Sequence, residues 1–174
     1  MKDSNYHIAI REEMEKLAEN YKVIFLGQQT LSESFYGTLK NIPVERRMEM
    51  PVAEDMQMGL SIGLALEGYL PVSIFQRMDF LPRACDQLVN HLNLMKKLTR
   101  DRYNPKVIIR TTIGIENVGL QHNKDLTDMF QAILEFPVVK VTTVEEVKEA
   151  YKLAREGMDS ILIIEDQKLY SVKE

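Results

Sequence analysis

A carboxylate, an aromatic ring and a histidine are the side chains of this sequence best placed to do chemistry. Glu54 follows a short predicted strand and opens a predicted helix, while Phe80 and His122 lie in two later loops. A buried carboxyl group can exchange a proton with a heterocyclic base near neutral pH. An aromatic ring can stack on a flat ligand ring, and histidine is suited to proton transfer near neutral pH. Together these residues are candidates for binding a flat heterocycle.

Each of the three residues also has a purely structural interpretation. Acidic residues are common in the first turn of a helix, where they favour the positive end of the helix dipole. Phe80 can be an ordinary core aromatic, and His122 can cap the helix that follows it. Taken singly, Glu54 and Phe80 are better explained as structural residues, and His122 is open between the two interpretations.

Two glycines lie one turn apart in the helix predicted from Glu54 to Glu67. A glycine in a helix interior costs roughly 1 kcal/mol relative to alanine. Gly59 and Gly63 therefore indicate close packing on one helix face, either against the sheet of the same domain or against a helix of another subunit. We favour the subunit interface, because local helix stability does not return the cost of two glycines.

The elements that position these residues follow from apolar periodicity, which alternates between helix-like and strand-like segments along the chain. The predicted helices span residues 6–20, 34–39, 54–67, 81–98, 125–134 and 144–156. The predicted strands span residues 23–26, 46–50, 72–75, 107–110, 138–141 and 161–164. This alternation predicts an α/β fold, a three-layer sandwich with a mostly parallel sheet and helices on both faces. No linker or repeat divides the chain, so residues 1–174 are expected to form a single domain.

The loops beyond the carboxyl ends of parallel strands are where such sheets bind ligands. In this sequence they cover residues 27–30, 51–54, 76–80 and 111–122. Glu54, Phe80 and His122 all fall within these loops or at their ends. The predicted strand order thus brings the three candidate residues to one edge of the sheet.

Composition narrows the functional class. The chain of 174 residues has a net charge of −4, which argues against a nucleic-acid surface. A single cysteine fits a reducing compartment, and no apolar run approaches the ~20 residues that cross a bilayer. We therefore expect a cytoplasmic protein without membrane or nucleic-acid partners. No residue spacing suggests a metal site, and no glycine-rich loop is suited to cradle a phosphate.

The segment PVAEDMQMGLSIGLALEGYLPVSIFQRMDFLPRACDQLVNH, residues 51–91, resembles the pyrimidine-binding domain of thiamine-diphosphate enzymes. It is most similar to the β subunit of the 2-oxo-acid dehydrogenase first component, within the transketolase group. The similarity extends from VIFLGQQT to ILIIEDQKLYS. It is carried by the Pro-x-x-Glu sequence, the glycine helix, the Asp-Gln-x-x-Asn sequence and GLQH.

The resemblance implies a role for each candidate residue. Glu54 matches the glutamate that hydrogen-bonds a ring nitrogen of the aminopyrimidine, so that the exocyclic nitrogen can remove the proton from the thiazolium carbon. Phe80 matches the aromatic that stacks on the pyrimidine, with Val52 beside it. His122 matches a histidine near the substrate. Gln28 is expected at the cofactor as well, at a position where the family usually has an acid that couples paired active sites.

The resemblance also implies what other chains must supply. In this family the diphosphate and Mg²⁺ bind a separate domain through a Gly-Asp-Gly motif, which does not occur in these 174 residues. We expect a chain with neither that domain nor the family's carboxyl-terminal domain. We therefore expect thiamine diphosphate to be shared with a diphosphate-binding α-type partner chain that holds Mg²⁺. The glycine helix implies self-association as well, as a dimer or within a heterotetramer.

Three functions follow from this sequence. The first is the pyrimidine-binding subunit of a split thiamine-diphosphate enzyme, acting on a 2-oxo acid or a ketose by decarboxylation or two-carbon transfer. The second is a non-catalytic binding or regulatory module that forms a homodimer, favoured by Gln28 and by Arg83, which replaces a Gln or Glu of the family. The third is an unrelated α/β domain for a nucleotide-like ligand, which the missing phosphate loop disfavours.

Overall fold

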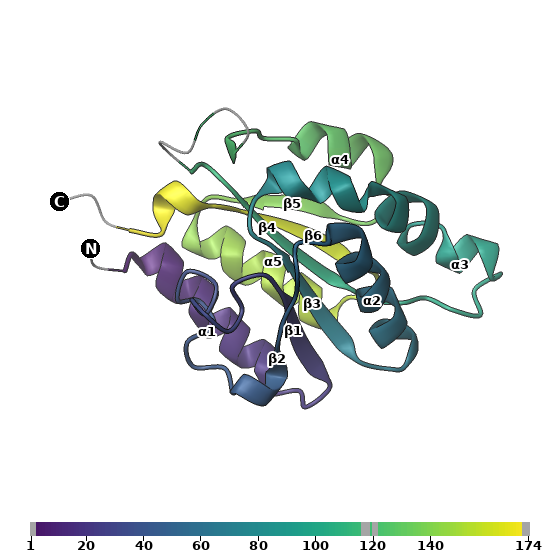
Figure 1. The fold of residues 1–174 in the computed structure, drawn as a ribbon, viewed down its shortest axis with the longest axis horizontal. Coiled ribbons are helices and arrows are strands. Elements are labelled where there is room, and N and C mark those ends of the chain that lie inside the picture. The colour runs from purple at the N-terminus through teal and green to yellow at the C-terminus, as the bar shows by residue number, and fades with distance from the viewer. Residues whose placement is uncertain (1–2, 116–118, 120–121, 172–174) are drawn as a thin grey trace.

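Six parallel strands form one sheet in the order β2-β1-β3-β4-β6-β5 (Figure 1). The computed structural model describes residues 3–115, 119 and 122–171. The strands are β1 (Val23–Gly27), β2 (Arg47–Glu49), β3 (Leu70–Phe75), β4 (Ile108–Ile113), β5 (Val138–Val141) and β6 (Ile161–Asp166). The α-helices are α1 (Asn5–Ala18), α2 (Glu54–Leu66), α3 (Met95–Leu98), α4 (Thr127–Ile133) and α5 (Val144–Glu156). The other helical segments are η1 (Val44–Arg46), η2 (Met78–Ala84), η3 (Asp86–Leu92) and η5 (Gln167–Leu169).

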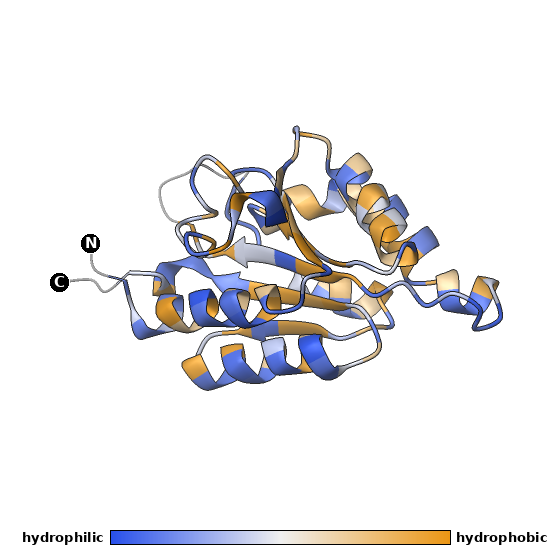
Figure 2. Cartoon of the chain, turned by 90° about the horizontal axis from the view of Figure 1, so that it is seen from below, coloured by the Kyte–Doolittle hydropathy of each residue, from blue (hydrophilic) through white to orange (hydrophobic). Residues whose placement is uncertain are grey.

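The sheet separates two hydrophobic cores, and Figure 2 shows it edge-on between helical layers. Alternate residues of a strand point to opposite faces. On β6, Ile161 and Ile163 therefore pack toward α1 and α5, whereas Leu162 and Ile164 pack toward α2, η2, η3 and α4. Strands buried on both faces are typical of parallel sheets. The predicted three-layer α/β sandwich is confirmed.

The prediction of a helix over residues 34–39 is wrong. This segment is a run of turns in which Ser34, Phe35 and Tyr36 have positive φ angles of 49°, 42° and 54°. Phe35 is fully buried, and its ring lies 4.7 Å from the guanidinium carbon of Arg110. Leu39 is buried as well. Phe35 and Leu39 have helix-like spacing because both enter the same core, although the backbone between them forms turns.

The long helix predicted over residues 81–98 is broken into η2, η3 and α3. Pro82 lies within η2, a 3₁₀ segment, and has no backbone N–H to donate to an α-helical hydrogen bond. The next segment, η3, is a π-helix. Its wider turn is seen in the hydrogen bond from the Asn93 N–H to the Leu88 carbonyl, at 3.0 Å. The segment is therefore helical as predicted but changes its winding between η2 and η3 and again between η3 and α3.

A buried polar cluster lies between the sheet and the layer formed by α1 and α5. Arg110 and Glu165 are both fully buried, with two guanidinium nitrogens each 2.8 Å from a carboxylate oxygen. The hydroxyls of Tyr151 and Tyr170 donate to the same carboxylate, and Arg110 also donates to Thr38 at 2.9 Å. Burial first, and then the charge of Glu165, raises the pKa of both tyrosines well above the usual 10, so they remain donors.

Candidate active site

Glu54 is the first residue of α2 and is buried within this chain alone, with 3% of its surface exposed. It follows β2 and the short segment around Pro51, and the preceding Ala53 has no side chain that could cap the helix. The carboxylate therefore sits at the positive end of the helix, where a negative charge is favoured. Its burial does not require a neighbouring subunit.

Arg83 is the one cation in contact with this carboxylate among the residues that the structure describes. Its Nε lies 2.9 Å from Glu54 Oε2. The same oxygen is out of contact with solvent and has no partner in hydrogen-bond geometry, so the contact is an ion pair without an aligned N–H donor. The two partners differ sharply in exposure, because 68% of the Arg83 side chain is exposed. Such a half-exposed pair is weak, and Arg83 is free to turn away into solvent.

A narrow crevice lies in front of Glu54, at the carboxyl edge of β1 and β3. Its lining consists of Gln28, Glu54, Gln57, Ile74, Phe75, Gln76 and Phe80. Gln57 is held in place because its amide donates to Ser73 Oγ at 3.1 Å and to the Ile74 carbonyl at 3.0 Å. In this conformation the crevice cannot hold even a water molecule. A ring can enter only if side chains around the crevice move.

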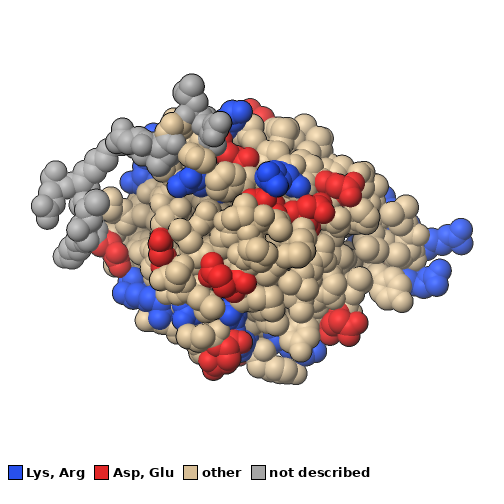
Figure 3. Space-filling model, viewed as in Figure 1, with Lys and Arg blue, Asp and Glu red and all other residues tan. Residues whose placement is uncertain are grey.

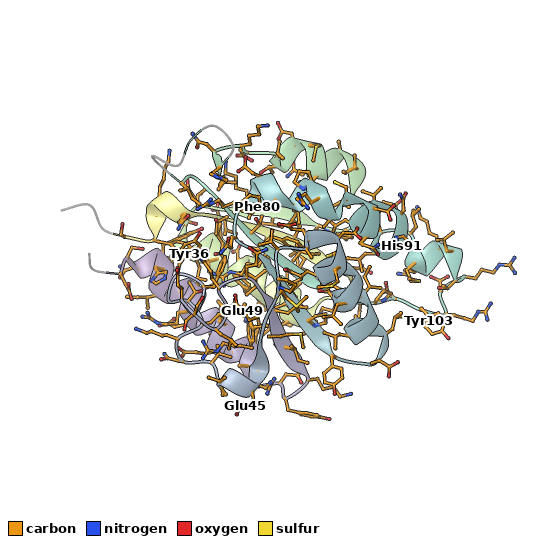
Figure 4. The ribbon with its side chains drawn as sticks, in the orientation of Figure 1. Tyr36, Glu45, Glu49, Phe80, His91 and Tyr103 are labelled. Atoms are coloured by element: carbon orange, nitrogen blue, oxygen red, sulfur yellow. The ribbon has the colours of Figure 1, made fainter. Side chains whose placement is uncertain are left out.

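Phe80 and His122 are in contact, as the predicted loop positions require. Their rings meet edge to face, with centroids 5.5 Å apart and planes at 74° (Figure 4, where Phe80 is labelled). His122 Nδ1 is buried without a hydrogen-bond partner. On another side of the Phe80 ring, the guanidinium carbon of Arg77 lies 5.9 Å from the centroid. The structure thus joins Glu54, Phe80 and His122 into one region.

Backbone contacts fix the loops that carry these residues. The Asp79 carboxylate accepts the Lys124 N–H at 3.2 Å, which ties the Phe80 loop to the loop of His122. On the other side, Glu49 at the end of β2 (labelled in Figure 4) accepts the N–H groups of Gln29 at 2.5 Å and Leu31 at 2.7 Å. Sequence reasoning missed Asp79, Glu49 and Arg77, because nothing in their local sequence distinguishes them from surface charges.

The remaining predicted site residues have mixed outcomes. Gln28 lines the crevice, and its amide lies 3.5 Å from the Pro51 carbonyl. Val52 is 73% exposed and does not line the crevice, so its contact with a cofactor stays a prediction. Part of the predicted loop before His122, residues 116–118 and 120–121, lies outside the described residues.

Comparison with known proteins decides the family. Residues 3–173 match the family described as "Transketolase, pyrimidine binding domain". This chain belongs to that family. It is 25% identical over 95% of its length to the pyruvate dehydrogenase E1 component subunit beta of Gracilaria tenuistipitata var. liui, of which it covers 54%. It is 30% identical over 74% of its length to the protein of that name from Cyanidium caldarium, of which it covers 39%.

A solved structure shows the same fold. The chain titled "Split gene transketolase, inactive beta4 tetramer" superposes with a TM-score of 0.70 at 21% identity, covering 98% of this chain and 51% of that one. At this identity the likeness shows the fold alone. The chain spans about half the length of the relatives it matches, so the activity of those whole proteins is a matter for proposal.

The outer face of α2 in this pyrimidine-binding domain is apolar. Met56 and Leu60 of this helix are 50% and 37% exposed, and Val52, two residues before the helix begins, is 73% exposed. Gly63 continues the same face, and a Cβ atom there would meet nothing within 4 Å. Gly59 instead faces the domain's own Gln87, 3.6 Å from where its Cβ would lie. In Figure 3 the surface over α2 carries few charged residues.

A larger hollow of about 440 Å³ lies at the opposite edge of the sheet, near α3. Its charges pair across it, since Lys96 lies 3.8 Å from Asp159 and Lys97 lies 2.5 Å from Glu135. It is away from the carboxyl ends of the strands and contains none of the candidate residues. Three basic residues in and next to α3, Lys96, Lys97 and Arg100, contribute to this hollow.

Within residues 3–115, 119 and 122–171, no group of three or more His, Cys, Asp or Glu side chains is arranged to hold a metal ion. In the same part of the chain, every helix is too short or too polar to span a bilayer.

Proposed function

We propose that this chain is the pyrimidine-binding subunit of a split thiamine-diphosphate enzyme that acts on a 2-oxo acid or a ketose. The observation that carries the proposal is Glu54 itself, a buried carboxylate at the carboxyl edge of the sheet whose Oε2 accepts no aligned hydrogen bond and contacts only the largely exposed Arg83 among the described residues. That oxygen is suited to a hydrogen bond with a ring nitrogen. Membership in the pyrimidine-binding family supports the same assignment.

The residues around Glu54 fit an aminopyrimidine ring. Phe80 offers a ring for stacking, and Gln28 offers an amide group at the rim of the crevice. When bound, thiamine diphosphate supplies a thiazolium carbon that attacks a carbonyl group and then stabilises the charge left by bond cleavage. Glu54 holds the proton at the pyrimidine ring nitrogen and orients that ring. His122 lies beside Phe80, where it can exchange a proton with a substrate oxygen.

A partner chain completes the site in this proposal. It carries the diphosphate-binding domain, holds Mg²⁺ and covers the crevice. The apolar face of Val52, Met56 and Leu60 fits burial against another chain, because its side chains are exposed beside the crevice loop. The same face can also join two copies of this domain, giving a dimer or a heterotetramer. Residues 1–174 act as a single domain in this assembly, and the cytoplasm is the proposed location.

The alternative is a non-catalytic module that forms a homodimer. One observation favours it: Arg83 occupies the Glu54 oxygen that must reach the pyrimidine. If Arg83 stays there, the crevice remains closed and the fold serves only in binding or regulation. Because 68% of the Arg83 side chain is exposed, we prefer the enzyme, in which Arg83 moves aside on binding.

The test is reconstitution with a partner chain that carries the Gly-Asp-Gly motif. Calorimetry with thiamine diphosphate and Mg²⁺ measures binding, and turnover is measured with pyruvate and with a ketose phosphate. We expect E54Q to lower turnover by ~100-fold or more, because a proton-holding group is lost. D55N is the matched control, since Asp55 is the adjacent acid of the same helical turn and is exposed. Equal turnover of E54Q and D55N excludes the proposed role of Glu54.

A further inference from the structure

Among the residues that the structure describes, no carboxylate forms an ion pair with Arg77. It lies two residues beyond β3 and is half-buried. Its Nε is out of contact with solvent and has no hydrogen-bond partner, and within the described ranges it forms no ion pair. An unpaired buried donor costs free energy, and a charged one costs more. A half-buried guanidinium in this state is available to bind a ligand.

The position of Arg77 points to the reaction site. Its guanidinium carbon is 5.9 Å from the centre of the Phe80 ring, the ring that lines the crevice of Glu54 and contacts His122. Cation–π attraction is significant only within about 6 Å, so this contact is at its limit and leaves the Nε–H donor unused. His122 Nδ1 is a second unpartnered nitrogen beside the same ring.

The carboxylate nearest to Arg77 along the chain is already engaged. Asp79 accepts the backbone N–H of Lys124, at 3.2 Å to one oxygen and 3.4 Å to the other. Gln76, the residue before Arg77, is fixed because its carbonyl accepts the Thr112 hydroxyl at 2.6 Å. The backbone at Arg77 is thus anchored, and its side chain is left to bind a ligand.

We propose that Arg77 binds the anionic group of the substrate, a carboxylate or a phosphate. The planar guanidinium presents paired donors that match either oxyanion. The proposal rests on the proposed function, since it places the substrate beside Phe80 and His122. It makes Arg77 a specificity residue: the enzyme takes a carbonyl compound that carries an oxyanion and discriminates against a neutral aldehyde or ketose.

The first test uses the full chain with ¹⁵N-labelled arginine, and the probes are pyruvate and inorganic phosphate. NMR follows the Nε–H signal of Arg77 and, as an internal control, that of Arg102, which is exposed near the opposite edge of the sheet. We expect at least one probe to move the Arg77 signal in a saturable way while the Arg102 signal shifts little. A response to pyruvate assigns a carboxylate, and a response to phosphate assigns a phosphate. If neither probe moves Arg77 more than Arg102, the proposal is overturned.

The second test uses the complex with the partner chain and compares R77Q, R77K and R102Q. R77Q removes the charge, whereas R77K keeps it without the planar fork. We expect R77Q to raise KM for the anionic substrate by ~10-fold or more with a smaller change in kcat, R77K to be intermediate and R102Q to match wild type. Unchanged KM in R77Q overturns the proposal, and an equal loss of thiamine-diphosphate affinity would assign Arg77 to the cofactor instead.

The two tests separate failure of this inference from failure of the proposed function. If thiamine diphosphate does not bind the wild-type complex, the proposed function fails, while the NMR titration of the chain still reports whether Arg77 binds an oxyanion. If the cofactor binds and E54Q is inactive but Arg77 responds to neither anion, only the inference fails.

Discussion

Two arginine–glutamate pairs in this domain differ in burial and in hydrogen bonding. Arg110 and Glu165 are fully buried, and both carboxylate oxygens accept hydrogen bonds from the guanidinium and from tyrosine hydroxyls. Arg83 and Glu54 share one contact, with a buried carboxylate, an exposed arginine and an oxygen without a hydrogen bond. We call Arg110 and Glu165 the closed pair, because hydrogen bonds within the chain reach both carboxylate oxygens. We call the surroundings of Glu54 and Phe80 the open region, because polar atoms there lack hydrogen bonds.

This difference separates structural from functional charge. A buried polar group that is fully hydrogen-bonded rigidifies a fold, whereas an unsatisfied one needs an explanation. Around Phe80 three such groups gather, on Glu54, Arg77 and His122. Their common position at the carboxyl edge of the sheet is where ligands bind in parallel α/β folds. We therefore expect changes at the closed pair to alter stability and changes at the open region to alter binding.

The largest effect is expected at the closed pair. E165Q leaves the buried charge of Arg110 without a counter-charge, and breaking a buried pair in this way costs ~3–5 kcal/mol. Urea unfolding should therefore give a free energy of unfolding lower by about that amount. The matched control is K97A, which removes one partner of the exposed pair with Glu135 and should cost less than ~1 kcal/mol. Equal losses in E165Q and K97A would remove the distinction between the two kinds of pair.

A smaller effect is expected when Arg83 is replaced. R83Q frees the Glu54 oxygen that the guanidinium occupies at 2.9 Å. Exposed ion pairs are worth ~0.2–1 kcal/mol, so thiamine diphosphate should bind the reconstituted complex up to ~5-fold more tightly. Calorimetry of R83Q against R102Q, which alters a distant exposed arginine, measures this gain. Weaker binding in R83Q would mean that Arg83 helps to hold the ligand and does not compete with it.

At the open region, the amide variant of Glu54 should barely change stability. In E54Q the partner left behind is Arg83, which is already exposed and can turn to solvent. We expect the free energy of unfolding of E54Q to exceed that of wild type by up to ~1 kcal/mol. Residues selected for function are often not the most stable choice at their position. Urea unfolding of E54Q beside E165Q gives the direct comparison. A loss as large as that of E165Q would make Glu54 a structural residue.

The same two pairs explain what the sequence could predict. The candidate residues Glu54, Phe80 and His122 were placed at one edge because apolar runs mark the strands and the loops follow from them. The strands predicted to end at Arg110 and at Ile164 continue to Ile113 and Asp166. Their ends were placed too early because Arg110 and Glu165 are charged. Each neutralises the other across 55 residues of sequence, and local patterns carry no sign of that pairing.

The open region was predictable only in part, for a related reason. The contact of Arg83 with Glu54 and the position of Arg77 beside Phe80 both depend on the winding of η2 around Pro82. A prediction of one continuous helix over residues 81–98 leaves Arg77 and Phe80 in the preceding loop and gives the segment around Arg83 α-helical winding in place of the 3₁₀ winding of η2. The residue types of the site could therefore be identified, but the charges that surround it could not.

The smallest expected effect concerns a histidine on the closed side of the sheet. His7 is buried in α1, with Nε2 2.9 Å from the Tyr36 carbonyl and Nδ1 3.3 Å from Asp3. Burial lowers the pKa of His7 below its ordinary 6.5, assisted by the charges of Arg11 and Arg110 and opposed by the Tyr36 hydrogen bond and Asp3. The unfolded chain therefore takes up this proton at a higher pH than the folded chain.

The sign of the pH dependence follows from that order. Above pH 6.5 His7 is mostly neutral in both states and adds no slope, whereas below 6.5 the unfolded state binds the extra proton and stability falls. H7Q keeps an amide donor for Tyr36 and should flatten this fall from pH 6.5 downward. The comparison ends where carboxyl groups begin to titrate in both proteins, among them Glu146 and Asp125, whose pKa values in the folded chain lie below the ordinary 4.5 and 3.8. Urea midpoints measured across this window for wild type and H7Q test it. Parallel curves would show that the loss on acidification arises elsewhere, and that the packing around His7 does not disfavour its protonated form.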